Sequence, residues 1–463
     1  MTDAPWSGDA CSLVDAFRSG ERSPTEELEA TWAAIDASEL NAFVWLDTDQ
    51  ARHRAQAADL TQPFGGVPVG IKSLDTVEGW PYTEECLVFA GRVADHTSTH
   101  ITRMTDRGGI VPVGQTLASE FGGLNVSTNL LHGTCHNPWE RGRSAGGSSG
   151  GSSAAVAGGL VTIASGGDGG GSIHIPAGFC GLVGMKGTAG RIPRGPKTLI
   201  APMTVVVGCQ ARSVRDVARW YDVATGYDSR DPYSLPRIDG WERDLGSFDL
   251  AGKKVAIIPT LGTAIVRDEV QERVVAAGTA LARDAGLTMV DIDCGLKPLD
   301  LHWALGNLSG LFEDLRGFWP ECKDQLTKST WRGLELAEQL VDLDMVAKGE
   351  AARTAANEAM ADMFDQVDFV ISATNPDTAF PAEVMANNRV GERKVEGGNN
   401  GALTIPANMS GNPAISIPVE PVNGLPVGMQ VMGRHHEDQL LLDLAAVVER
   451  EVPWPLVAPC APC

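Results

Sequence analysis

Apolar residues recur at two different spacings along the chain, one typical of helices and the other of buried strands. Residues 23–26 (Ser-Pro-Thr-Glu) form a capping box with proline at the first helical position. Leu28, Trp32 and Ile35 follow at helical spacing. An amphipathic helix of about 15 residues is therefore expected to begin here. Residues 67–71 instead form a short apolar run, which predicts a buried strand leading directly into Lys72.

Strands and helices alternate over most of the remaining sequence. Further strands are expected at 110–113, 161–164, 182–185, 254–259, 288–293, 369–372, 414–419 and 426–431. Further helices are expected at 49–60, 98–106, near Leu117, and at 214–225, 269–285, much of 301–363, and 438–451. This alternation predicts an α/β layered fold with a largely buried, mixed or parallel sheet.

The chain shows no sign of division into independent domains. No linker rich in Gly, Ser and charged residues interrupts it, and no repeat of 20–50 residues is visible. We therefore expect one domain over residues 1–463. Residues 227–373 contain the longest expected helices and none of the glycine-rich signals, so this variable helical region is expected to cover and shape a site built by other residues.

Composition and charge narrow the class of protein. The 463 residues include 37 Lys and Arg against 59 Asp and Glu, a formal net charge of −22. Nucleic-acid clamps and proteins that bind anionic membranes need a basic surface, so neither partner is expected. No apolar run is long enough to span a membrane, and the first 13 residues lack the basic start of a signal peptide. These features favour a soluble cytoplasmic chain.

The nine cysteines are scattered and odd in number, which is a poor disulfide framework and fits a reducing compartment. Cys460 and Cys463 have the spacing of a redox motif or half of a zinc site. They lie on a Pro-rich tail without a partner pair, so we expect a mobile tail rather than a metal or redox site. No organic cofactor and no metal is expected.

Two glycine-rich loops flank one short strand. Gly146-Gly-Ser-Ser-Gly-Gly151 comes first, and Gly166-Gly-Asp-Gly-Gly-Gly-Ser172 follows. Glycines without Cβ allow backbone N–H groups to converge on an anion or oxyanion. Neither loop has the Gly-Lys-Ser/Thr of a P-loop or the spacing of a dinucleotide fingerprint. Residues 146–150 formally match the Gly-x-Ser-x-Gly elbow of α/β-hydrolases. Such an enzyme also needs a downstream histidine for a Ser-His-Asp triad, and no downstream histidine lies in a motif that indicates this role.

The motifs around these loops resemble the amidase signature family of serine hydrolases. The resemblance is strongest over residues 64–196, which we take as the signature core, and it resumes at 408–418 and 424–430. It rests on Gly65-Gly-Val-Pro-Val-Gly-Ile-Lys72, His136-Asn-Pro-Trp139, the two glycine loops, Gly170-Gly-Ser-Ile-His-Ile-Pro-Ala177, and Phe179-Cys-Gly-Leu-Val-Gly184. It implies a single large domain with a mixed, mostly parallel central sheet covered by helices on both faces.

The resemblance also implies a role for particular residues. Ser172 would be the nucleophile, Ser148 a bridging serine on a cis peptide, and Lys72 the general base. The oxyanion would be stabilised by the backbone amides of Gly169, Gly170, Gly171 and Ser172. Ser149 is expected to cap a helix start and to help hold Lys72, and Asp168 to organise the loop by hydrogen bonds.

Three residues depart from the family pattern. Ser73 stands where Asp is common, and Gly169 replaces a commoner Thr, which indicates a softer and roomier loop. His174 stands where Arg is usual, and we expect it to pair with Asp168 only when protonated, so that loop order depends on pH.

The expected activity is hydrolysis of a small, rather apolar amide, anilide or carbamate, as in aryl acylamidases, nylon-oligomer hydrolases and urethanases. A homodimer is compatible with this. The alternative is the glutaminase subunit of a tRNA-dependent amidotransferase, which would need a stable protein partner and a strict preference for glutamine. A non-catalytic binding module is the other rival, and the presence of all three triad residues argues against it.

Overall fold

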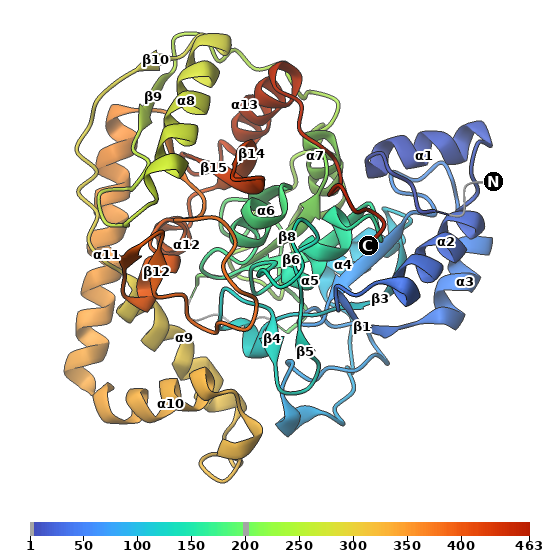
Figure 1. Ribbon diagram of the computed structural model, residues 1–463, viewed down its shortest axis with the longest axis horizontal. Helices are drawn as coiled ribbons and strands as arrows, with labels where there is room; N and C mark the ends of the chain where they lie inside the picture. The colour runs from blue at the N-terminus through green and yellow to red at the C-terminus, as the bar shows by residue number, and fades with distance from the viewer. Residues whose placement is uncertain (1–3, 198–202) are drawn as a thin grey trace.

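The computed structural model, which describes residues 4–197 and 203–463, is built around one sheet of eleven strands (Figure 1). The strand order is β1-β3-β2-β6-β8-β7-β14-β15-β11-β9-β10. Their bounds are β1 Phe43–Leu46, β2 Pro68–Lys72, β3 Val111–Thr116, β6 Ile163–Asp168, β7 Val183–Lys186, β8 Val206–Ala211, β9 Lys254–Ile257, β10 Thr288–Met289, β11 Phe369–Ala373, β14 Ala414–Val422 and β15 Leu425–Gly433. Two small hairpins lie outside this sheet: β4 Thr128–Asn129 with β5 Gly133–Thr134, and β12 Arg389–Val390 with β13 Arg393–Lys394.

The sheet is mixed, as the sequence predicts. Strands β3, β2 and β6 are parallel to one another, and so are β11, β9 and β10. Antiparallel neighbours join these two blocks from β6 through to β11, and β1 is antiparallel to β3. Antiparallel pairing is therefore more common among the described strands than predicted, partly because β14 and β15 form a hairpin with only Asn423 and Gly424 between them.

Helices cover both faces of the sheet. On one face α2 (Pro24–Ala37), α3 (Thr48–Gln56) and α5 (Gly150–Ala157) share an apolar core, which α6 (His174–Cys180) extends. The other face is covered by α1 Ala10–Ser19, α4 Thr99–Asp106, α7 Val214–Ala224, α8 Asp268–Asp284 and α13 Asp438–Glu451. The α/β layered fold with helices on both faces is thus confirmed.

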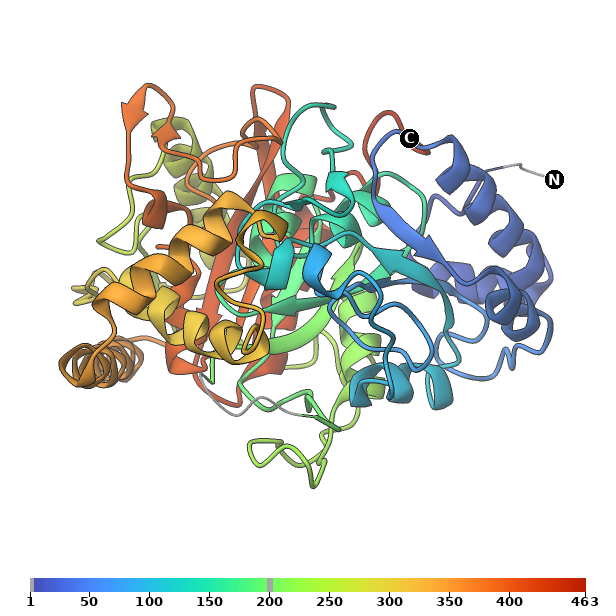
Figure 2. The ribbon, with the colours of Figure 1, turned by 90° about the horizontal axis from the view of Figure 1, so that it is seen from below.

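The variable region forms a block of helices beside the sheet. It consists of α9 (Asp300–Asp314), α10 (Lys328–Leu340) and α11 (Leu343–Gln366), and α12 (Ile405–Ser410) packs against it. Figure 2 shows these yellow and orange ribbons gathered at one side of the molecule. The helical content expected for residues 301–363 is confirmed.

Two local predictions are wrong. No α-helix forms near Leu117, because β3 continues through Thr116 and the Leu117 amide then donates to the carbonyl of Ala42 at 2.9 Å; only a short 3-10 turn follows at Glu120–Gly122. The strand expected at 288–293 is only Thr288–Met289, an exposed pair at the sheet edge. The strand β8 was not predicted at all, although it lies in the middle of the sheet.

The C-terminal tail is attached to the fold, which corrects the expectation of a mobile tail. The amides of Ala458 and Cys463 donate to the carbonyls of Ala157 and Gly158 at 2.7 and 3.0 Å. These carbonyls lie at the C-terminal end of α5, where a helix has acceptors without partners of its own. Cys460 and Cys463 form a disulfide, and the other seven cysteines are free and buried.

Within the described ranges, no helix combines the length and the apolar character needed to cross a bilayer.

Candidate active site

Lys72 is the last residue of β2 and lies beside the second glycine loop. Strands β2 and β6 are parallel, with Val69 opposite Ile163 and Gly70 opposite Ala164. Parallel strands bring their carboxyl ends to the same edge, so Lys72 and the end of β6 meet there. The side chain is 3% exposed. Its Nζ donates to Ser148 Oγ at 2.8 Å, to Ser149 Oγ at 2.8 Å and to the Gly167 carbonyl at 3.2 Å.

Burial lowers the pKa of Lys72 from 10.5 to about 8, although the carboxylates of Asp75 and Asp168 partly oppose this. Asp75 follows the strand and accepts from Ser165 Oγ at 2.7 Å. Ser165 Oγ in turn accepts from the backbone amide of Lys72 at 2.8 Å. About half of the amine is therefore neutral near pH 8, and a neutral amine next to a hydroxyl can accept its proton.

The first glycine loop presents Ser148 to this lysine. The Gly147–Ser148 peptide bond is cis, as the family resemblance implies. A side chain on Gly147 has no space, since a Cβ there would lie 2.4 Å from the Val126 nitrogen. Ser127 Oγ donates to the carbonyls of Gly146 and Ser148 at 3.1 and 3.2 Å, which holds the loop in place. Ser148 and Lys72 are both buried and in direct contact.

Ser149 precedes α5 but does not cap it with its side chain, so the expected capping bond is wrong. Its hydroxyl turns instead to the lysine, and it also donates to the Gly167 carbonyl at 3.3 Å. The Gly150 amide at the helix start donates to Ser127 Oγ at 2.9 Å. Ser127 therefore supplies the capping bond that the sequence assigned to Ser149.

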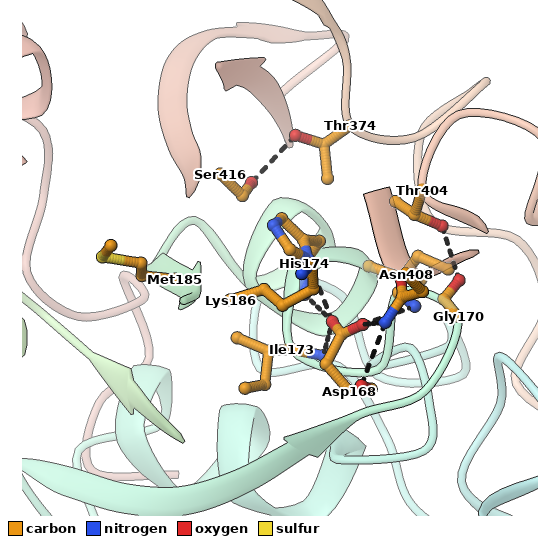
Figure 3. A network of polar contacts seen from close by, with 12 residues as sticks. Asp168, Gly170, Ile173, His174, Met185, Lys186, Thr374, Thr404, Asn408 and Ser416 are labelled. Carbon is orange, nitrogen blue, oxygen red and sulfur yellow. Dashed lines mark hydrogen bonds and ion pairs between the residues drawn. The ribbon is translucent and has the colours of Figure 1, made fainter. Parts of the chain in front are cut away.

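Asp168 organises the second glycine loop from its base (Figure 3). Its Oδ1 accepts from the Gly171 amide at 2.8 Å, and its Oδ2 accepts from the Ile173 amide at 2.7 Å. Asn408 Nδ2 donates to Oδ1 at 2.8 Å and to the Asp168 carbonyl at 3.0 Å. Burial would raise the pKa of this carboxyl, but His174 and these donors hold it below its usual range. A buried carboxylate therefore fixes the path of the 168–174 loop.

His174 begins α6 and pairs with the same carboxylate. Its Nδ1 lies 2.9 Å from Asp168 Oδ2, and both side chains are buried. The expected pairing is confirmed. A neutral ring with its proton on Nδ1 could donate the same bond as a protonated ring, so the expected dependence on protonation stays a prediction. His174 Nε2 has no hydrogen-bond partner among the described residues.

The donors expected for an oxyanion fall into two groups. The Gly171 amide is already bonded to Asp168. Among the described residues, the amides of Gly169, Gly170 and Ser172 and the Ser172 hydroxyl have no protein partner within hydrogen-bond distance. These three residues are also partly exposed, in contrast to the buried Lys72 and Ser148. The structure thus leaves free N–H groups around an accessible serine.

Ser73 does not make the loop roomier, which corrects that expectation. It is buried and donates from Oγ to Glu85 Oε1. Glu85 also accepts from the Ala118 amide at 3.1 Å and from Asn129 Nδ2 at 2.6 Å. Burial raises the pKa of Glu85 to about 7, although these hydrogen bonds act to lower it. Ser73, the residue after Lys72, therefore belongs to a buried hydrogen-bonded cluster with Glu85 and Asn129.

Residues outside the sequence prediction also reach the site. Trp303 of α9 donates from Nε1 to the Gly169 carbonyl at 2.6 Å, and Thr404 donates from Oγ1 to the Gly170 carbonyl at 2.6 Å. Asn408 stands in a stretch that resembles the family, so a signal for it existed. Nothing in the local sequence points to Trp303 or Thr404. No group of three or more His, Cys, Asp and Glu side chains in the described part of the chain is arranged to hold a metal ion.

Comparison with known proteins identifies the family. The family model described as "Amidase" matches residues 26–442. An acylamidase from Rhodococcus erythropolis is 33% identical, with 96% of this chain and 95% of that protein aligned. One subunit of the glutamyl-tRNA(Gln) amidotransferase from Lacticaseibacillus paracasei is 29% identical, with 95% of this chain and 96% of that protein aligned. The crystal structure of a bacterial aryl acylamidase of the amidase signature family superposes with a TM-score of 0.90, 25% identity and 97% coverage of both chains. The chain belongs to the amidase family of amide-hydrolysing enzymes.

Proposed function

We propose that this enzyme hydrolyses a small apolar amide, anilide or carbamate through an acyl-enzyme on Ser172. The observation that carries the proposal is the contact between Lys72 Nζ and Ser148 Oγ at 2.8 Å, made by a buried lysine whose pKa is lowered to about 8. A serine hydroxyl is a weak nucleophile unless a base removes its proton. Lys72 would supply that base through Ser148.

The proton relay runs in both directions. As Ser172 Oγ bonds to the carbonyl carbon, its proton moves to Ser148 Oγ while the proton of Ser148 moves to Lys72 Nζ. The relay then returns a proton to the leaving nitrogen as the C–N bond breaks, which leaves the acyl group on Ser172. Water repeats the sequence, breaks the ester and restores the Ser172 hydroxyl. A carbamate passes through a carbamoyl or carbonate-like acyl-enzyme by the same steps.

Aromatic groups near Ser148 support an apolar substrate. Gly122 lies beside the Ser148 hydroxyl, since a Cβ on it would be in ordinary van der Waals contact with that oxygen at 3.5 Å. The neighbouring Phe121 is half-buried and packs edge-on against Phe89, with ring centroids 6.1 Å apart. Leu308 and Leu311 of α9 belong to the same apolar cluster. Helix α9 therefore carries both Leu308 and Leu311 of this apolar cluster and Trp303, which contacts the second glycine loop.

The glutaminase role is the second candidate, because an amidotransferase subunit is among the relatives. A glutamine substrate brings an ammonium and a carboxylate, whereas the cluster around Phe121 is apolar. We propose that the enzyme acts in the cytoplasm without a different protein as partner; seven of its nine cysteines are free and buried, which fits a reducing compartment, and the Cys460–Cys463 disulfide is the exception.

The experiment is a substrate panel in buffer with a chelator and no nucleotide. A 4-nitroanilide, an aryl carbamate and glutamine are incubated with the purified enzyme and with Ser172→Ala, and released amine or ammonia is measured. We expect turnover of the anilide or the carbamate by the wild type only. Turnover of glutamine alone would favour the second candidate. Activity lost to the chelator and restored by zinc would contradict the mechanism.

A further inference from the structure

The variable region contacts the backbone of the second glycine loop through one side chain. The indole of Trp303 lies directly on Gly170, where an added Cβ would be 2.6 Å from Cζ2 of the ring. Its Nε1 donates to the Gly169 carbonyl at 2.6 Å. Thr404, just before α12, donates to the next carbonyl, that of Gly170, at 2.6 Å (Figure 3). Both peptide planes that flank Gly170 are therefore held by side chains from outside the loop.

Holding a carbonyl also sets the direction of the adjoining amide. The Gly169–Gly170 peptide is trans, so its N–H points away from its C=O. Since the carbonyl faces Trp303, the Gly170 amide faces the opposite side, where no described residue accepts its hydrogen. Glycine rotates more freely than any other residue, and without these bonds the peptide would sample other directions. An oxyanion donor acts only if its direction is fixed before the reaction.

We infer that Trp303 is a positioning residue for catalysis: its hydrogen bond to Gly169 aims the Gly170 amide at the oxyanion that forms on the substrate. The inference rests on the proposed function, because it needs Ser172 as the nucleophile. Thr404 supports the same geometry by fixing the following peptide, whose own amide is already bonded to Asp168. The helical block thus contributes to the reaction itself.

The test uses Trp303→Phe, which keeps an aromatic ring and removes the N–H donor. Trp454→Phe is the matched control, because Trp454 Nε1 also donates to a backbone carbonyl, that of Arg212, at 3.0 Å and is also half-buried, but the acceptor lies outside the glycine loops. The rate of Ser172 labelling by an aryl fluorophosphonate is measured for both, together with kcat and KM for a 4-nitroanilide. The phosphoryl oxygen of the probe needs the same donors as the acyl oxygen.

We expect Trp303→Phe to label and turn over about tenfold to a hundredfold more slowly, somewhat less than the loss of a whole oxyanion donor. KM should change less than threefold, and Trp454→Phe should label within twofold of the wild type. If Trp303→Phe labels as fast as the wild type, the inference is wrong while the proposed function stands. If wild-type Ser172 is not labelled at all, the proposed function fails and the inference fails with it.

Thr404→Val provides a second route if Trp303→Phe does not fold. It removes one hydroxyl at nearly constant shape, and we expect at least a threefold slower labelling with unchanged KM. Labelling of Thr404→Val at the wild-type rate would then overturn the inference.

Discussion

Replacing Lys72 by methionine is expected to slow acylation of Ser172 by at least about a hundredfold, the lower range for removing a general base. Methionine fills the space of the lysine stem but cannot take the proton of Ser148, to which Lys72 Nζ is bonded at 2.8 Å. The wild-type acylation rate should rise with pH, reach half of its plateau near pH 8 and level off at higher pH, since burial lowers the pKa of Lys72 to about 8. The measurement is single-turnover kinetics with a 4-nitroanilide between pH 6 and 10.

The same substitution also has a predicted effect on stability. The folded pKa of Lys72 is about 8 and the unfolded value is 10.5, so the unfolded chain binds more protons between these two pH values. The cost of burying the charge, roughly 3 kcal/mol for a shift of this size, is full below pH 8 and fades toward pH 10.5. Lys72→Met removes this cost but leaves two hydroxyls without their donor. We therefore expect neutral-pH stability equal to or higher than that of the wild type, with the difference narrowing as pH rises.

Lys186 offers a matched control. It lies on β7, is 1% exposed, and burial likewise lowers its pKa to about 8. Its Nζ donates to the Gly187 carbonyl at 3.2 Å, and neither Ser148 nor Ser172 is its partner. Lys186→Met should lose less than about tenfold in rate, well short of the loss expected for a general base. If Lys72→Met turns over at a near-normal rate, or loses no more than Lys186→Met, Lys72 is not the base.

Asp168→Asn is expected to lower kcat/KM by about a hundredfold and the free energy of unfolding by roughly 3–5 kcal/mol. The carboxylate accepts from the amides of Gly171 and Ile173 and from His174 Nδ1, and an amide group cannot accept from all of them. The buried Lys186 would also lose a compensating negative charge. Chemical denaturation and kinetics at neutral pH measure the two effects.

The pH dependence of this variant has a definite sign. The folded pKa of Asp168 lies below the unfolded value of 3.8, so the stability it contributes is complete at neutral pH. That contribution is lost as pH falls from about 4 toward the folded pKa. The gap in stability between the wild type and Asp168→Asn should therefore be largest at neutral pH and shrink below about pH 4.

Asp443→Asn is the control that distinguishes a changed conformation of the 168–174 loop from a general loss of stability. Asp443 is a buried carboxylate on α13 that accepts from the amides of Gly246 and Phe248 at 2.7 and 2.9 Å. Its substitution should lower stability but change kcat/KM less than twofold. Equal losses of activity in both variants would show that Asp168 only stabilises the fold.

The position of Lys72 could be predicted because its signal is local. A short apolar run ends at the lysine, and the structure ends β2 at the same residue. The elements that were missed have weaker local signals. Helix α6 is buried on every side and contains Pro176 and Gly178, so it shows no amphipathic period. Strand β8 differs from α6: it is buried throughout like β2, and its apolar run at 205–207 was a strand signal that the prediction did not use.

Long-range contacts set the rest of the site. Trp303 and Gly169 are 134 residues apart in the chain, and their hydrogen bond depends on how α9 packs beside the sheet. The six-residue separation predicts that His174 lies near Asp168. Which ring nitrogen faces the carboxylate depends on how His174 is oriented at the start of α6, and the structure places Nδ1 there. The capping bond at the start of α5 also depends on the tertiary fold. It comes from Ser127, which lies 23 residues before Gly150 in the chain, and not from the adjacent Ser149.

The central claim is that Ser172 is the nucleophile, and covalent labelling tests it most directly. The enzyme is incubated with an aryl fluorophosphonate, and the adduct is counted by intact mass and located by peptide mapping. We expect one adduct per chain, on Ser172, with no adduct and no turnover in Ser172→Ala. Labelling of Ser148 with Ser172 unmodified, together with full activity of Ser172→Ala, would contradict the account.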